Sequence, residues 1–275
     1  MAEWRLERQR VEGLLRQCLT PAIRPPDAGV RPVVEAPSTL SYSMLSTYLD
    51  CSRKAYLRFL AGFPGEPVTY ATGPGSAFHA AMEALDSAQR SGQPFTFDQA
   101  VEAFEEAAAG AHGTTSHRAT QVELAMLRQF WTGPDRAATP LLTEAEFYWR
   151  VGPGYLHGFI DRVQRCPDGA IELIDFKTSK SALTEVQVRD NLQLLIYALA
   201  VREVYDVIPD RLTLVYPRLG SRVSVSFSES ELRAARARIV DLMEWARTAS
   251  YADVNTAHCR SCEYRLICPA ARDMS

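Results

Sequence analysis

The feature that most constrains the fold is a change of hydrophobic period near residue 145. Three short segments rich in aromatic and β-branched residues follow one another: AEFYWRV, YLHGFIDRVQR and AIELIDFKTS. Turn-forming GPG and CPDG sequences lie between them. Short segments of this kind, joined by tight turns, are typical of consecutive antiparallel strands. The sequence therefore predicts a three-stranded meander.

Segments with a helical period surround the predicted meander. Residues 184–204 form a strong amphipathic pattern, 211–218 and 222–228 have the composition of two more strands, and 228–249 form a long helical pattern. A chain that alternates strands and helices in this way buries its sheet between helices. We expect an α/β fold with a central mixed β-sheet flanked by helices.

The remaining segments set the expected domain organisation. We expect an N-terminal helix and proline-rich linker over residues 1–38, followed by one main domain over 39–275. Residues 44–60 have the periodicity of one continuous helix, with Gly62 as its stop. Residues 97–140 are predicted to be a helical insertion, and 251–275 a cysteine-rich tail with little periodicity of its own.

The net charge of −3 and the pI of about 6.0 exclude a global basic field, so any contact with phosphate must be local. No apolar run is long enough to cross a bilayer, and the N-terminal MAEWRLERQR is charged rather than signal-like. We therefore expect a cytoplasmic protein without a membrane partner. In that compartment, ordered cysteine spacing favours metal binding over a disulfide framework.

Asp175 and Lys177 are charged residues set into the third predicted strand. Residues two apart share a face of a strand, so both side chains project to one side while Phe176 projects to the other. The CPDG turn should bring Asp161, on the preceding strand, level with Asp175. Two carboxylates and an ammonium are thus expected to converge on one small patch.

Neighbouring buried carboxylates repel one another, and a divalent cation such as Mg²⁺ or Mn²⁺ resolves this conflict through hard oxygen ligands. Lys177 could then orient or help deprotonate an attacking water, or stabilise charge that develops on a phosphate. The alternative is an internal ion pair of Asp175 with Lys177, and Asp161 bonded to Arg162 or to solvent.

Four motifs occur in order along the chain. They are His79 in GSAFHAAME, Asp161 in GFIDRV, the DFK of residues 175–177, and Gln193 with Tyr197 in QLLIYA. This ordered set resembles the PD-(D/E)xK nucleases, in particular the RecB-type branch that includes CRISPR adaptation nucleases and nuclease domains of recombination helicases. The resemblance extends over about residues 41–269.

The resemblance implies a restriction-endonuclease-like core with a metal site. The implied metal ligands are His79, Asp161, Asp175 and the carbonyl of Phe176. The implied catalytic residues are Asp161, Asp175, Lys177, Gln193 and Tyr197. Gln193 and Tyr197 would support Lys177 and contact the nucleic-acid backbone, and we add Arg189, one helical turn earlier, as a further nucleic-acid contact. Without the resemblance, His79 could be a core histidine and the Gln193–Tyr197 pair an ordinary polar helix face.

Cys259, Cys262 and Cys268 form a C-x2-C-x5-C motif, and Cys51 lies far upstream. Four thiolates suit either tetrahedral zinc or an iron–sulfur cluster. One distant cysteine with a group of three resembles the 4Fe-4S staple of the RecB-type branch, so we favour the cluster and keep zinc as the alternative. Cys18 and Cys166 are expected to be unligated.

Basic residues flank the predicted cluster ligands. Arg53 and Lys54 follow Cys51, and Arg58, Arg260 and Arg265 lie nearby in sequence. They could form a local basic patch for a nucleic-acid strand that enters the site, or an ordinary solvated charged face.

These observations predict a metal-dependent DNA nuclease, most simply an exonuclease directed to single strands or free ends, in repair, recombination or defence. The alternative from another class is a non-catalytic DNA-binding subunit of a helicase–nuclease assembly. RNA as a substrate stays open, and a helicase or recombination partner is expected only by analogy.

Overall fold

The computed structural model describes residues 38–63, 65, 74–111 and 116–272. The expected N-terminal helix and linker, apart from residue 38, and Cys18 therefore lie outside the described residues. The chain divides into two compact units, one of residues 68–241 and one that combines residues 1–67 with 242–275. Each unit is described by itself, and the assignment of 39–275 to one domain stays a prediction.

The larger unit is built on a mixed sheet. Its strands are β2 (Thr139–Val151), β3 (Gly154–Arg165), β4 (Ile171–Phe176), β5 (Arg211–Tyr216) and β6 (Ser221–Val225). The pairs β2–β3, β3–β4 and β5–β6 are antiparallel, whereas β4–β5 is parallel. The predicted meander and the mixed α/β sheet are confirmed, although β2 begins at Thr139, within the stretch that we expected to be helical.

A parallel strand pair needs a crossover connection, and helices α7 (Glu185–Arg189) and α8 (Leu192–Tyr205) supply it between β4 and β5. The expectation of one continuous helix here is wrong. Asn191 starts a new helix, because its side chain accepts a hydrogen bond of 3.0 Å from the backbone N–H of Leu194. Ten consecutive residues of α8 are buried, so this helix is enclosed on all sides along its first turns.

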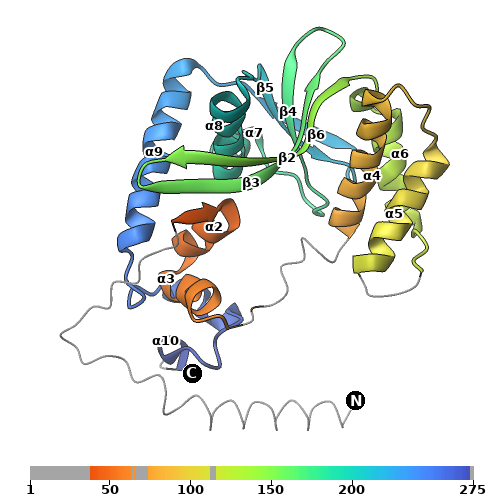
Figure 1. The fold of residues 1–275 in the computed structure, drawn as a ribbon. Coiled ribbons are helices and arrows are strands. Elements are labelled where there is room, and N and C mark those ends of the chain that lie inside the picture. Colours follow the sequence, from red (N-terminus) through yellow and green to blue (C-terminus); the bar gives the residue numbers. More distant parts are fainter. Residues whose placement is uncertain (1–37, 64, 66–73, 112–115, 273–275) are drawn as a thin grey trace, which may run out of the picture. The chain divides into compact units, whose positions relative to one another are not determined.

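A second group of helices packs on β4 and β5. It consists of α4 (Pro74–Arg90), α5 (Phe97–Ala111), α6 (Gln121–Thr132) and the short η2 (Pro134–Arg136). Phe78, Leu85 and Phe104 of this group share a core with Ile174 and Phe176 of β4. Figure 1 shows α8 and the α4–α6 group on opposite sides of the strands.

The smaller unit is mostly helical. Its elements are β1 (Thr39–Ser41), α2 (Tyr42–Asp50), α3 (Ser52–Ala55), η1 (Tyr56–Leu60), the end of α9 (Glu229–Thr248), η3 (Thr256–Ser261) and α10 (Pro269–Arg272). The expected continuous helix over 44–60 is wrong, because Cys51 has an extended backbone (φ −166°, ψ 117°) between α2 and α3. Gly62 ends the segment with a φ of 69°, as expected. Across the described parts of the chain, no helix has the length and apolar character needed to span a membrane.

Candidate active site

The β3–β4 hairpin brings two carboxylates together. Arg162 lies opposite Ile174 in the antiparallel ladder, so Asp161 and Asp175 meet at the next position. The backbone N–H of Phe176 donates a hydrogen bond of 2.7 Å to Asp161 Oδ2. Both carboxylates are almost fully buried. The structure therefore places them on adjacent strands at one level of the sheet.

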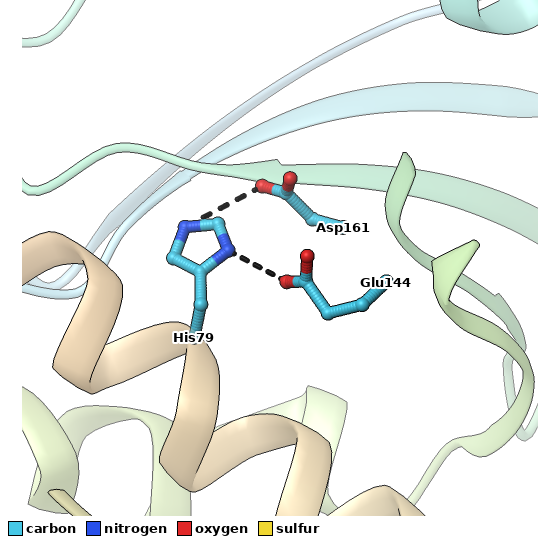
Figure 2. A group of neighbouring side chains, drawn as sticks. All are labelled: His79, Glu144 and Asp161. Carbon is cyan, nitrogen blue, oxygen red and sulfur yellow. Dashed lines mark hydrogen bonds and ion pairs between the residues drawn. The ribbon is translucent and has the colours of Figure 1, made fainter. Parts of the chain in front are cut away.

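His79 reaches this pair from helix α4. Its Nδ1 lies 2.8 Å from Glu144 Oε1, and its Nε2 lies 3.7 Å from Asp161 Oδ2. Figure 2 shows the imidazole ring between the two carboxylates. One ligand atom from each of these three residues lies within 4.8 Å of the other two, so together they could hold a metal ion.

Glu144 is a site residue that the sequence did not reveal. It lies in β2, between the cross-strand pairs Thr143–Arg162 and Ala145–Ile160, and therefore across from Asp161. Its φ of 44° is a left-handed conformation that is rare for a residue other than glycine, and such conformations cluster at functional sites. The only signal in the sequence was an acid directly before the predicted strand AEFYWRV.

The charges of the site are not balanced by protein cations alone. Burial lowers the pKa of His79, but the carboxylates of Asp161, Glu144 and Asp175 outweigh this and raise it to about 9. Burial and the Asp175 carboxylate hold the pKa of Asp161 well above its usual range. The group thus has an excess of negative charge that a divalent cation would offset.

Lys177 links the carboxylates to helix α8. Its Nζ lies 2.6 Å from Asp175 Oδ2 and donates a hydrogen bond of 2.9 Å to Gln193 Oε1. Gln193 Nε2 in turn donates a hydrogen bond of 2.8 Å to the hydroxyl of Tyr197. The chain Asp175–Lys177–Gln193–Tyr197 is the arrangement expected if Gln193 and Tyr197 support Lys177.

The alternative of a structural Asp–Lys ion pair describes only part of this arrangement. The Asp175–Lys177 pair is formed, but Arg162 bonds to Asp86 at 2.9 Å and Asp161 accepts from the backbone instead. Asp86 lies two helical turns after His79 on α4, and it also accepts a hydrogen bond of 2.8 Å from the hydroxyl of Thr143 in β2. This buried ion pair fixes the helix that carries His79 onto the strands that carry Glu144 and Asp161.

Arg189 does not join this group. We expected it on one helix face with Gln193 and Tyr197, but it lies on α7, whereas those two residues lie on α8. Its guanidinium lies 3.5 Å from Glu231 and 3.6 Å from Glu185. Both of these pairs are exposed, and a role in nucleic-acid binding stays a prediction.

The four cysteines of interest converge in the smaller unit. Cys51, Cys259, Cys262 and Cys268 line one cavity of about 200 Å³. Burial raises the pKa of the Cys259 and Cys262 thiols. Four thiolates around one cavity could bind either a zinc ion or an iron–sulfur cluster.

Basic residues near this cavity have carboxylate or carbonyl partners. Arg53 Nε donates a hydrogen bond of 3.0 Å to the Tyr251 carbonyl. The Lys54 ammonium lies 3.2 Å from the Asp50 carboxylate, and the Arg58 guanidinium lies 3.6 Å from the Glu263 carboxylate. The contacts of Arg53 and Arg58 connect the segment after Cys51 with the chain around the C-terminal cysteines. A DNA contact by Arg53 or Lys54 stays a prediction.

Comparisons with known proteins give one family. The family model of the PD-(D/E)XK nuclease superfamily matches residues 39–269. No curated protein matches the chain. A solved structure named "Crystal structure of SSO0001" has 16% sequence identity and a TM-score of 0.40, and the match covers 86% of this chain and 89% of that one.

Proposed function

The chain belongs to the PD-(D/E)XK nuclease superfamily, and from this premise we propose that it hydrolyses phosphodiester bonds in DNA with the help of a divalent metal ion. Members of this superfamily are typically metal-dependent nucleases. The observation that carries the proposal is the convergence of His79, Asp161, Asp175 and Lys177 from three separate elements on one buried site.

The donor set fits Mg²⁺ or Mn²⁺. Carboxylate and carbonyl oxygens are the ligands that hard cations prefer, and the basic groups in contact with Asp161 and Asp175 are His79 and Lys177. His79 Nε2, Asp161, Asp175 and the carbonyl of Phe176 would hold the ion. When bound, the ion supplies Lewis-acid activation of a phosphate oxygen and of water.

Glu144 orients His79 in this proposal. A metal-binding imidazole commonly donates its other ring N–H to a carboxylate, which fixes the tautomer and the ring orientation. In the neutral imidazole that binds a metal, the 2.8 Å contact of Glu144 with Nδ1 favours the tautomer that carries its proton on Nδ1, which leaves Nε2, on the side of Asp161, as the ligand atom. Glu144 is therefore a positioning residue rather than a ligand.

Lys177 acts on the substrate. Its ammonium is held between Asp175 Oδ2 and Gln193 Oε1, so it is fixed beside the metal-binding carboxylate. A positive charge held at this point stabilises negative charge that develops on the phosphate as water attacks. Gln193 and Tyr197 keep it there.

The four cysteines would bind a 4Fe-4S cluster. All four line one cavity, and one distant cysteine with a group of three is the spacing that resembles a 4Fe-4S site. The cluster would join Cys51 to the C-terminal tail and stabilise the smaller unit. Zinc stays the alternative, and the inventory of metal and sulfide in protein purified without oxygen separates the two.

The substrate in this proposal is DNA with a free end or a single-stranded region, and the setting is repair, recombination or defence, with a helicase or recombinase as partner. The test is degradation of internally labelled linear and circular single strands with Mg²⁺ or Mn²⁺. Loss of the linear strand alone indicates an exonuclease. Metal-dependent binding without cleavage, unchanged by Asp175→Ala, would instead support the non-catalytic DNA-binding subunit.

A further inference from the structure

One face of the β2–β3 hairpin carries a row of aromatic rings. The cross-strand pairs on this face are Arg150 with Tyr155, Tyr148 with His157, and Glu146 with Phe159. Phe147, Trp149 and Leu156 alternate with them and are buried on the other face. The hairpin is therefore anchored by one face and presents the other.

The exposure of these rings is unusual within the described residues. Tyr148, Tyr155 and Phe159 are 57%, 42% and 47% exposed, and the only other exposed Phe, Tyr or Trp side chain in the described ranges is Trp245. The outer face of an antiparallel pair is normally polar. Exposed aromatic groups gathered on one face indicate a binding surface.

The rings are held in place before any ligand arrives. Tyr148 and His157 are stacked, with ring centroids 4.4 Å apart and an interplanar angle of 22°. His157 Nε2 lies 2.9 Å from Glu146 Oε1, which fixes the imidazole. Phe159 meets His157 edge-on at 5.5 Å. A preorganised surface of this kind loses little conformational entropy on binding.

This face leads directly to the candidate metal site. Phe159 precedes Asp161 by two residues on β3, and Glu146 follows Glu144 by two residues on β2. At a rise of about 3.3 Å per residue, Phe159 is about 7 Å from Asp161 along the strand and Tyr155 about 20 Å. A ligand that covers the rings therefore approaches the carboxylates from one side.

We propose that Tyr148, Tyr155, His157 and Phe159, here called the aromatic platform, bind unpaired bases of a single nucleic-acid strand and guide it toward the metal site. Aromatic side chains stack on bases without regard to sequence, and only unpaired bases offer their faces. Exposed Arg150, at the far end, supplies a phosphate contact, while Glu146 is engaged by His157. The inference rests on the proposed function for the identity of the ligand.

The test measures binding of the full chain in EDTA, so that neither metal nor cleavage contributes. The probes are a fluorescein-labelled oligothymidylate and a duplex whose ends are closed by hairpins. The leucine pair, Tyr148→Leu combined with Phe159→Leu, removes two rings and keeps apolar bulk. The control pair, Tyr148→Phe combined with Phe159→Tyr, keeps both rings. Thermal unfolding establishes that both variants fold.

We expect the leucine pair to bind the single strand at least about 25-fold more weakly, since each stacked base contributes at least about a 5-fold change in Kd. The control pair should bind like the wild type, and duplex binding should not change. The slope of log Kd against log salt should stay the same in the leucine pair but decrease by about 1 in Arg150→Gln. A 2-aminopurine base in the probe should lose its quenching only in the leucine pair.

Equal binding by the leucine and control pairs would overturn the platform, including the case in which the face serves a protein partner. If Asp175→Ala still abolished cleavage in that case, the proposed nuclease would stand without the platform. Conversely, loss of binding in the leucine pair of a protein that never cleaves DNA would leave the platform and remove the nuclease.

Discussion

Lys177 Nζ donates a hydrogen bond of 2.9 Å to Gln193 Oε1, which joins strand β4 to helix α8 at the candidate active site. The same ammonium lies 2.6 Å from Asp175 Oδ2. A lysine side chain has four rotatable bonds, so two fixed partners on different elements restrict where its charge can lie. The position of this charge therefore depends on how α8 packs against the sheet.

Replacement of Gln193 by leucine removes the acceptor for Lys177 and keeps the size of the side chain. We expect the single-turnover cleavage rate to fall about 10- to 100-fold, because a misplaced catalytic group costs this much, while DNA affinity is retained. Lys177→Met should lower the rate about 10²- to 10⁴-fold. Since both act through one ammonium, the double variant should be no slower than Lys177→Met alone.

Val204→Ala, at an exposed position of the same helix, is the control for this series. Additive losses in the double variant would show that Gln193 acts independently of Lys177, which contradicts the positioning role.

Glu144 and His79 offer a second test, which separates orientation from ligation. Glu144→Ala should weaken Mn²⁺ binding about 10- to 100-fold, because the imidazole loses the partner of its Nδ1. Glu144→Gln keeps a carbonyl oxygen that accepts from Nδ1–H, so it should bind Mn²⁺ more tightly than the alanine variant. Calorimetric titration measures both, with exposed Glu83 of α4 changed to alanine as the control. Equal loss in the two Glu144 variants would indicate direct ligation.

The charge of the Asp161 carboxylate should lower the free energy of unfolding when no metal is bound. Its burial beside Asp175 raises its pKa, so at neutral pH its ionisation opposes folding. Asp161→Asn removes that charge and keeps an acceptor for the N–H of Phe176. We expect the Tm in EDTA to rise by about 2–4 °C, which corresponds to about 1 kcal/mol in a domain of this size. The rise in Tm that Mn²⁺ gives the wild type should be lost; its persistence in the variant would remove Asp161 from the metal site.

Local patterns predicted much of this site, and nonlocal geometry supplied the rest. The turn between β3 and β4 fixes the register that pairs Asp161 with Asp175. A short stretch of sequence is enough to predict both this turn and the alternation of the strands. Glu144 could not be identified, because its role depends on a left-handed backbone and on a partner on another helix. The break at Cys51 was also hidden, since the apolar period of 44–60 continues through it.

Glu172 gives a pH-dependent prediction for the sheet. It is buried in β4, where burial raises its pKa, but hydrogen bonds from Thr213, Arg222 and Cys166, together with the charge of Arg222, outweigh burial and lower the pKa below its usual range. A depressed pKa contributes stability above the unfolded-state value of about 4.3, and this contribution is lost as the pH falls through the folded-state pKa.

Glu172→Gln should therefore be less stable than the wild type by about 1–3 kcal/mol at pH 7, and the difference should decrease below about pH 4. Denaturant unfolding between pH 3 and 7 measures this, with exposed Glu185→Gln as the control. A difference that does not change with pH would mean that the carboxylate charge of Glu172 is not involved.

The cysteines give the last prediction, which concerns the smaller unit. Cys51 ends α2 in an extended conformation, and it lines the same cavity as three cysteines more than two hundred residues later in the chain. A group that binds all four closes a loop of this length, which in the chain-entropy model is worth roughly 5 kcal/mol. Serine at any of the four positions should therefore lower the Tm and remove absorbance near roughly 400 nm from thiolate–iron charge transfer.

Cys166→Ser is the matched control for this test, because Cys166 lies in the larger unit and its thiol bonds to Glu172 at 3.3 Å, a contact that a hydroxyl can keep. It should retain both the colour and the Tm. Purification without oxygen and analysis for iron, sulfide and zinc complete the experiment. A colourless protein with one zinc per chain would contradict the cluster, even though the same four cysteines would still be the ligands.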